Sequence, residues 1–129
     1  MLDHIGIQVS DLKRSTAFYK AALAPLGITV LSEVTPDVSD GYEGAGFGSD
    51  KRAYFWIGKG KPGHSHSHVA FAAKDRATVQ AFYEAAIKAG GRDNGLPGLR
   101  PHYHKDYFGA FVLDPDGHNI EAVCRRPQG

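Results

Sequence analysis

The sequence predicts an α+β domain that contains two copies of one module, and three observations lead to this prediction. First, the stretch from residue 4 aligns without a gap with the stretch from residue 68, and eight of the 24 aligned pairs are identical. Average residue usage gives roughly one or two matches in such a window. Second, each copy opens with a strand pattern followed by a helix pattern. Third, 129 residues suit a single domain, residues 1–129, whereas two half-size modules are each marginal alone and should share one core.

Module one, residues 1–60, begins with a predicted strand at residues 2–9, where polar or small residues alternate with apolar ones. Asp11 is a suitable N-cap for the helix that follows, and Gly27 stands where that helix should end. Clusters of Pro, Gly, Asp and Ser separate the later strands. These strands are predicted at residues 28–34, 42–47 and 53–57.

Module two, residues 66–125, repeats this order after a linker at residues 58–63. A strand is predicted at residues 67–73, and a helix follows that begins at Asp75 and ends at Gly90 and Gly91. The later strands are a short one after Gly91, one at residues 107–113 and one at residues 119–124, with a turn at residues 114–117. Residues 96–106 are predicted to form a loop of 11 residues, which is long enough to suggest a functional role.

Composition excludes several classes of partner. The formal net charge is +1, from 15 basic and 14 acidic residues without a run of like charge, which argues against nucleic acid or an anionic membrane. Cys124 is the only cysteine and cannot form an internal disulfide, and no apolar stretch is long enough for a membrane span. Asp3, Lys13 and Arg14 interrupt the region where a signal peptide needs apolar residues. We expect a cytoplasmic protein.

Histidine stands at the same point of both modules, at His4 and His68. Each ring alone is explained by a core histidine bonded to a backbone carbonyl. A matched pair also fits two imidazoles that point into one shared cavity, where imidazole is a common metal ligand. Glu121 is the best candidate for a third ligand, because a buried carboxylate requires a cation or another partner. The alternative for Glu121 is an edge-strand charge that faces water.

Three segments resemble the vicinal oxygen chelate superfamily, which includes glyoxalase I, fosfomycin-resistance proteins, extradiol dioxygenases and bleomycin-binding proteins. The segments are HIGIQVSDLKRSTAFY, HVAFAAKDRATVQAFY and DPDGHNIEAV. The resemblance covers nearly the whole chain. It implies two βαβββ modules whose mixed sheets form a cup around a divalent metal, with the helices outside. It also implies a homodimer, in which the site lies either within one chain or across two.

Carried over residue by residue, the resemblance implies metal ligands at His4, His68 and Glu121. A fourth position, which is a glutamate in glyoxalase I, falls on or next to Trp56, and tryptophan cannot bind a metal. This departure argues against glyoxalase I activity and leaves a site with two histidines and one carboxylate. Such a set suits Fe, Mn, Ni or Zn, and it does not distinguish among them.

The remaining candidates concern the substrate. Trp56, Tyr54 and Phe47 are predicted to line an apolar substrate pocket, although core packing also explains them. In the predicted loop, His102, His104 and Tyr107 are candidates for a general acid or base, and Arg100 is a candidate to bind a substrate carboxylate. The alternative is an aromatic-rich surface loop. His66 shares the strand parity of His68 but is also explained by exposure beside the linker, to which His64 is assigned.

Two functions from different classes follow. The first is a metal-dependent enzyme acting on a small substrate whose two adjacent oxygens chelate the ion, by a lyase, isomerase, epimerase, transferase or dioxygenase reaction. The second is a metal-free protein of the bleomycin-resistance type, which sequesters a drug or metabolite in an aromatic cleft. The retained ligand set favours the enzyme.

Overall fold

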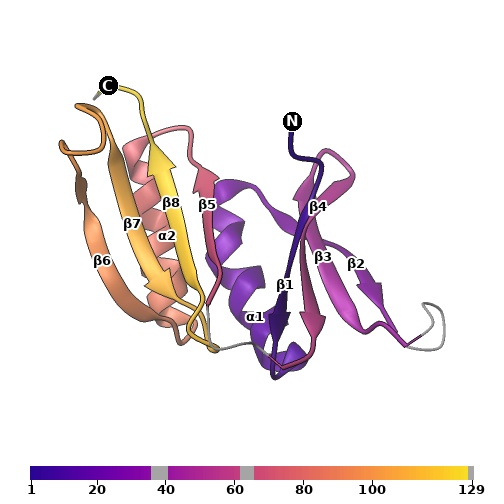
Figure 1. Ribbon diagram of the computed structural model, residues 1–129. Coiled ribbons are helices and arrows are strands. Elements are labelled where there is room, and N and C mark those ends of the chain that lie inside the picture. Colours follow the sequence, from indigo (N-terminus) through magenta and orange to yellow (C-terminus); the bar gives the residue numbers. More distant parts are fainter. Residues whose placement is uncertain (36–40, 62–65, 128–129) are drawn as a thin grey trace.

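The computed structural model describes residues 1–35, 41–61 and 66–127 (Figure 1). The predicted linker at residues 58–63 therefore lies partly outside the described residues, and His64 lies wholly outside them.

The order strand, helix, three strands occurs twice along the chain, as the sequence predicts. Module one contains β1 (Ile5–Val9), α1 (Leu12–Leu23), the single 3₁₀ turn η1 (Ala24–Leu26), β2 (Thr29–Val34), β3 (Gly44–Ser49) and β4 (Arg52–Lys59). Module two contains β5 (His68–Ala72), α2 (Arg76–Lys88), β6 (Arg92–Leu99), β7 (Phe108–Leu113) and β8 (Asn119–Cys124). The expected α+β class with two βαβββ modules is confirmed.

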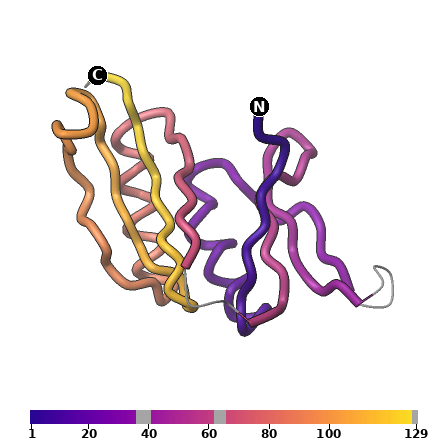
Figure 2. The backbone as a smooth tube through the Cα atoms, viewed as in Figure 1, coloured from indigo at the N-terminus to yellow at the C-terminus, as the bar shows by residue number. Residues whose placement is uncertain are grey.

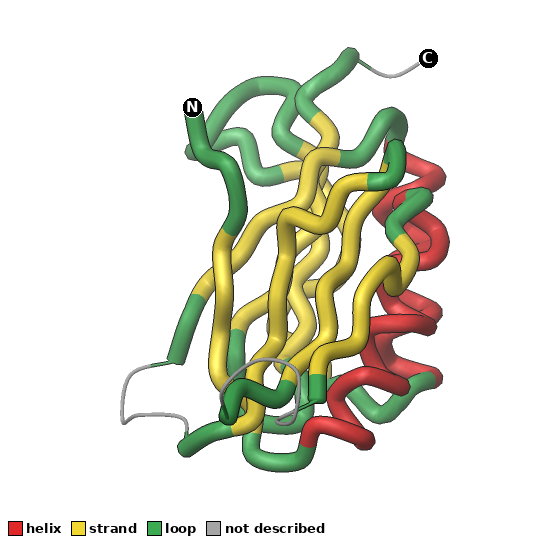
Figure 3. Tube along the Cα trace, turned by 90° about the vertical axis from the view of Figure 1, so that its right-hand side faces the viewer, coloured by secondary structure: helices red, strands yellow, loops and turns green. Residues whose placement is uncertain are grey.

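Each module forms its own four-stranded mixed sheet. The strand orders are β1-β4-β3-β2 and β5-β8-β7-β6, and the first strand of each module pairs in parallel with the last. The other pairs are antiparallel. Figure 2 shows the chain completing module one before it enters module two, and the two sheets stand side by side. Both helices lie on the same side of the strands (Figure 3), so each sheet keeps one face that no helix covers. We call these two faces the open faces.

The helix boundaries follow from the predicted caps. The side chain of Asp11 accepts a hydrogen bond from the backbone N–H of Arg14 at 3.1 Å, and that of Asp75 accepts one from Thr78 at 2.8 Å. These bonds satisfy N–H groups that have no partner inside the helix. Gly27 adopts a φ of 77° after the η1 turn, which is a conformation that glycine reaches without a steric penalty. Local sequence therefore determines where both helices begin.

One hydrophobic core connects the two modules. The rings of Phe55 on β4 and Phe71 on β5 meet edge to face with centroids 5.2 Å apart. Tyr19 on α1 is fully buried and packs edge to face on Phe55 at 5.1 Å. Because Phe55 and Phe71 belong to different modules, the burial of their contact stabilises the two sheets against each other.

A buried polar network in the turn at residues 114–118 also joins the modules. Tyr19 donates its hydroxyl hydrogen to Asp114 at 2.6 Å, across 95 positions of sequence. His118 lies 3% exposed; its Nδ1 accepts the N–H of Ser67, and its Nε2 is 2.8 Å from the backbone oxygen of Gln8. Since Nδ1 is an acceptor, Nε2 carries the hydrogen and donates it to module one. The Pro and Gly of this turn set its backbone, and Asp114 and His118 bind it to the other module.

The prediction of a loop at residues 96–106 is wrong for residues 96–99. Strand β6 continues to Leu99, so the connection begins only at Arg100. The Pro and Gly content of this segment suggested a loop. However, β6 is the edge strand of its sheet, and proline, which has no backbone N–H to donate, is tolerated on such a strand. Its pairing with β7 shifts register twice around Gly95, which accommodates the irregular segment.

The first strand also differs from its predicted bounds, because β1 begins at Ile5 and not at residue 2. His4 therefore immediately precedes its strand, whereas His68 is the first residue of β5. Among the residues that the structure describes, no helix is long and apolar enough to cross a membrane.

Candidate functional site

Alternation along β8 directs Glu121 to the open face of module two. Its neighbours Ile120 and Ala122 are fully buried in the core on the helix side, so the side chain between them points the other way. Strand β8 lies between β5 and β7, and Glu121 is only 1% exposed. The alternative of an edge-strand charge facing water is therefore wrong.

Two side chains contact the carboxylate of Glu121. The Nε2 atom of His68 lies 2.9 Å from Oε1, and the hydroxyl of Tyr107 donates a hydrogen bond to Oε2. The side chain of His68 is 53% exposed, so this group of residues has a solvent-accessible side. The structure thus brings together two of the three predicted metal ligands and one predicted catalytic residue. We call His68, Tyr107 and Glu121 the Glu121 cluster.

Tyr107 is held in its protonated form. Burial, the hydrogen bond to Glu121 and the negative charge of Glu121 raise the pKa of Tyr107 to about 12, although the Arg125 charge acts in the opposite sense. The Arg125 guanidinium carbon lies 4.9 Å from the centroid of the Tyr107 ring. At neutral pH the phenol is therefore a hydrogen-bond donor to the carboxylate and not a base.

Phe111 and Arg100 extend the open face beside the cluster. The Phe111 ring centroid is 6.2 Å from that of His68, and the guanidinium carbon of Arg100 lies 5.4 Å from the Phe111 centroid. Arg100 donates to the backbone oxygens of Gly98 at 2.9 Å and Leu96 at 2.8 Å. The guanidinium is thus fixed near the cluster, where it can attract a substrate anion.

His4 belongs to the other sheet. Its Nδ1 atom lies 2.7 Å from Oδ1 of Asp3, and Arg52 contacts the other carboxylate oxygen of Asp3. The hydrogen bond with His4, followed by the charge of Arg52, lowers the pKa of Asp3. These residues border a cavity of about 540 Å³ that also touches β5. In the part of the chain that the structure describes, no group of three or more His, Cys, Asp or Glu residues lies close enough to hold a metal ion.

Strand register identifies the residue of module one that corresponds to Glu121. Glu121 pairs with Ala70 of β5, and Trp56 pairs with Gly6 of β1, the residue aligned with Ala70. Trp56 therefore occupies the equivalent position on the open face of module one. Its indole covers Gly46, where an added Cβ would lie only 2.7 Å from the ring. This glycine makes room for the large side chain.

The other two predicted pocket residues lie in different environments. Tyr54 is half-buried, and its hydroxyl is 3.0 Å from that of Ser49 beside the cavity that contains His4. Phe47 is fully buried, with its ring 6.1 Å from that of Tyr19. Core packing, the alternative explanation, accounts for Phe47.

The predicted loop residues His102 and His104 are both exposed. The His102 ring is tilted against that of Tyr103, with the centroids 4.2 Å apart, and the Tyr103 ring meets that of Tyr107 edge to face at 5.1 Å. His104 accepts a hydrogen bond from the backbone N–H of Asp106 through Nδ1. In the part of the chain that the structure describes, Tyr107 is the one predicted catalytic residue that forms a hydrogen bond with Glu121.

Sequence reasoning missed Phe111, Asp3, Arg52 and Arg125 around these sites. Phe111 follows from the alternation of β7, because the flanking Ala110 and Val112 are buried on the helix side. Asp3 was visible as the acidic residue directly before His4. No sequence pattern pointed to Arg125, since only folding brings its guanidinium group to the Tyr107 ring.

A family profile agrees with these features. The profile described as "Glyoxalase/Bleomycin resistance protein/Dioxygenase superfamily" matches residues 1–122. A curated relative, metallothiol transferase FosB of Staphylococcus epidermidis, is 30% identical over 123 residues, which cover 93% of this chain and 78% of the relative.

Solved structures share the fold. A glyoxalase/bleomycin resistance protein from Albidiferax ferrireducens has a TM-score of 0.71 and 30% identity, covering 97% of this chain and 98% of that one. The FosX fosfomycin resistance protein from Listeria monocytogenes, solved as a mutant in complex with Mn(II) and a dihydroxypropylphosphonic acid, has a TM-score of 0.67. Its identity is 19%, and the alignment covers 96% of this chain and 91% of that one.

Proposed function

The chain belongs to the Glyoxalase/Bleomycin resistance protein/Dioxygenase superfamily, and from this premise we propose that it is a metal-dependent enzyme acting on a small substrate with two adjacent oxygens. The observation that carries the proposal is the buried carboxylate of Glu121, directed at the exposed ring of His68 on an open sheet face. The reaction belongs to the lyase, isomerase, transferase or dioxygenase types.

The residues of the Glu121 cluster fit a divalent ion. A carboxylate removed from water needs a positive charge or several hydrogen bonds, and Glu121 meets only a tyrosine hydroxyl and an imidazole among the described residues. Carboxylate oxygen and imidazole nitrogen suit Fe, Mn, Ni or Zn. We propose Glu121 and His68 as two ligands and His4 as the third. When bound, the ion supplies Lewis-acid stabilisation of negative charge that develops on a substrate oxygen.

A second copy of the chain completes the proposed site. His4 directly precedes β1 in module one, whereas Glu121 and His68 lie on the sheet of module two, and both sheets have an open face. We propose a homodimer in which the open face of module one covers that of module two from the partner. Each such cup contains one complete set of ligands. A twofold arrangement makes two equivalent sites.

Residues around the ligands act on the substrate. Tyr107 holds its proton against Glu121 and fixes the orientation of that carboxylate. Arg100 binds an anionic group of the substrate, and Trp56 with Tyr54 forms an apolar wall on the opposite face. His102 and His104 lie in the exposed connection before β7, where they can serve as general acid or base.

Two relatives support a metal. The curated relative is named a metallothiol transferase, and the FosX structure holds Mn(II) together with a dihydroxypropylphosphonic acid. A diol with an acidic group matches the kind of substrate proposed here, since its two adjacent oxygens would bind the ion and Arg100 would bind the acidic group.

Metal analysis tests the proposal. We expect the purified protein to bind close to one equivalent of a divalent ion per chain, and we expect His68→Ala and Glu121→Ala to lose it. Glu84→Gln removes an exposed carboxylate on α2 and should retain the metal. A parent protein that cannot be loaded with Fe, Mn, Ni or Zn would overturn the proposal.

Mixing two defective variants tests the shared site. His4→Ala and Glu121→Ala each lack one ligand in every chain. If the site lies across two chains, unfolding and refolding an equal mixture restores about one quarter of the sites, because half of the dimers are mixed and each has one intact set. Sites contained within one chain recover no metal.

The alternative is a metal-free binding protein of the bleomycin-resistance type. Trp56 favours it, because a large apolar ring stands where module two has Glu121. A parent without metal whose Trp56 fluorescence is quenched by an aromatic drug would support this alternative.

A further inference from the structure

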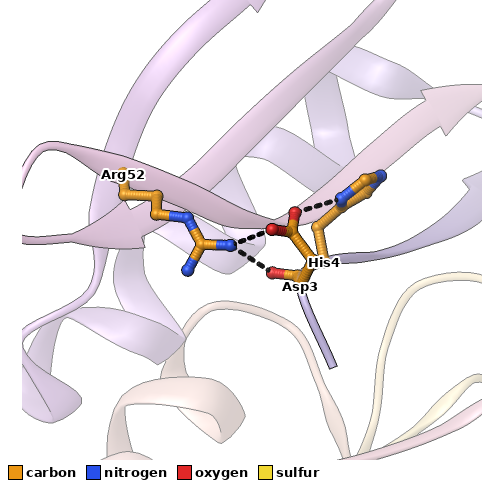
Figure 4. A network of polar contacts seen from close by, with 3 residues as sticks. All are labelled: Asp3, His4 and Arg52. Carbon is orange, nitrogen blue, oxygen red and sulfur yellow. Dashed lines mark hydrogen bonds and ion pairs between the residues drawn. The ribbon is translucent and has the colours of Figure 1, made fainter. Parts of the chain in front are cut away.

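An acidic residue and an arginine hold the side chain of His4 at the start of β1. Figure 4 shows the Asp3 carboxylate between the two: one oxygen is 2.7 Å from Nδ1 of His4, and the other is 2.5 Å from Nη2 of Arg52. The same Nη2 atom also donates to the backbone oxygen of Asp3 at 3.1 Å. Arg52 therefore fixes both the backbone and the side chain of Asp3.

We propose that Asp3, held by Arg52, is a positioning residue that sets the tautomer and orientation of His4 so that Nε2 faces the metal. This inference rests on the proposed function, because it gives His4 its role as a ligand. It adds two residues, Asp3 and Arg52, that contact neither metal nor substrate.

The chemistry of the contact selects one tautomer. An ionised carboxylate accepts hydrogen bonds and donates none, so the hydrogen between Asp3 and His4 belongs to Nδ1. A neutral imidazole with its hydrogen on Nδ1 keeps a lone pair on Nε2, which is the atom that can bind a metal. A carboxylate behind a ligand histidine also increases the basicity of the ring and restricts its rotation.

Module two orients its histidine differently. The residue aligned with Asp3 is Ser67. Its backbone N–H donates a hydrogen bond to His118, not to His68. His68 instead directs its Nε2 atom at Glu121, 2.9 Å away. By the same rule, the hydrogen shared by His68 and Glu121 belongs to Nε2 of His68, so the carboxylate contacts select opposite tautomers: hydrogen on Nδ1 in His4 and on Nε2 in His68. The Asp3 contact is thus a specific feature of module one, which has Trp56 in place of a carboxylate ligand.

Two measurements test the inference. The first is the affinity of the full-length protein for Zn(II), obtained by competition with a chromophoric chelator. We expect Asp3→Ala to weaken binding about 10-fold to 100-fold, as is usual for loss of a carboxylate behind a ligand histidine. Asp3→Asn keeps an acceptor oxygen and should lose less, as should Arg52→Gln. Glu84→Ala removes an exposed carboxylate elsewhere and should bind Zn(II) as the parent does.

The second measurement is the tautomer of His4 in the metal-free protein, from the ¹⁵N chemical shifts of its imidazole at about pH 8. We expect the hydrogen on Nδ1 in the parent and a shift toward the Nε2 form in Asp3→Ala. A role in fold stability alone would not produce this change. A parent ring with its hydrogen on Nε2 overturns the inference.

The outcomes separate the two proposals. Unchanged Zn(II) affinity in Asp3→Ala, with binding lost in His68→Ala and Glu121→Ala, overturns the inference and leaves the proposed function intact. A parent that binds no Zn(II) or other divalent ion overturns both. If the loss caused by Asp3→Ala persists in a His4→Ala background, Asp3 does not act through His4, and the inference also fails.

Discussion

Removing the hydroxyl of Tyr19 tests whether the hydrogen bond between α1 and the turn at residues 114–118 holds the modules together. Tyr19 is fully buried and Asp114 is 1% exposed, so Tyr19→Phe leaves a carboxylate oxygen without this donor and away from water. A hydrogen bond to a charged group contributes about 1.5–3 kcal/mol. Because the ring remains, little packing is lost. For a chain of this length we expect the melting temperature to fall by roughly 5–10 °C.

The assays are thermal unfolding, which gives the melting temperature, and urea unfolding, both followed by circular dichroism and by the fluorescence of the single tryptophan. Tyr83→Phe is the matched control, because Tyr83 occupies the position aligned with Tyr19 on α2 but is only half-buried. We expect its midpoint to stay close to that of the parent. The reasoning is refuted if Tyr19→Phe unfolds at the same urea concentration as the parent, or if both variants lose equal stability.

Three further predictions concern single sites. Tyr107→Phe should reduce the loss of stability between about pH 10 and pH 12. The pKa of Tyr107 is higher in the folded than in the unfolded chain, so its contribution to stability is complete below about pH 10 and disappears as pH rises through about 12. Identical alkaline unfolding of parent and variant would argue against this. Gly46→Ala should displace the Trp56 indole, destabilise the fold by about 1–3 kcal/mol and alter the maximum of tryptophan emission. The same change in a Trp56→Ala background should cost much less stability. Equal losses of stability in both backgrounds would contradict the predicted clash. Asp75→Asn should weaken the acid dependence of stability, because hydrogen bonds from Thr78 lower the pKa of Asp75 in the folded chain. The contribution of Asp75 to stability is present above its unfolded pKa and disappears as pH falls through its folded pKa. Parallel acid-unfolding curves of parent and variant would argue against this.

Local signals accounted for most of the fold. Asp11 and Asp75 are N-caps in the structure as in the sequence, and the strand at residues 119–124 has its predicted bounds. These features depend on residues close together in the chain. Strand β6 was not predicted to its full length, because its Pro and Gly residues are typical of loops and only its place at the edge of a sheet allows them there.

The candidate site divides in a similar way. The repeat identified His68, and the apolar strand around Glu121 identified that carboxylate; the structure brings these two side chains into contact. The burial of Glu121 could not be read from its neighbours, because it depends on β8 being paired on both sides. The contact with Tyr107 depends on the pairing of β7 with β8. The sequence could not assign Phe47 to the core or to a pocket, since aromatic residues line both.

The sequence alone determined the duplication, the order of the elements and the residues that distinguish the modules at equivalent positions, because repeats and alternation are properties of the chain itself. Tertiary structure decided which of these residues meet. It separates the Glu121 cluster on one sheet from His4 with Asp3 on the other, and it directs both open faces away from the helices. The physical reason is that the apolar faces of both sheets bury against α1, α2 and each other, which leaves the polar faces for chemistry.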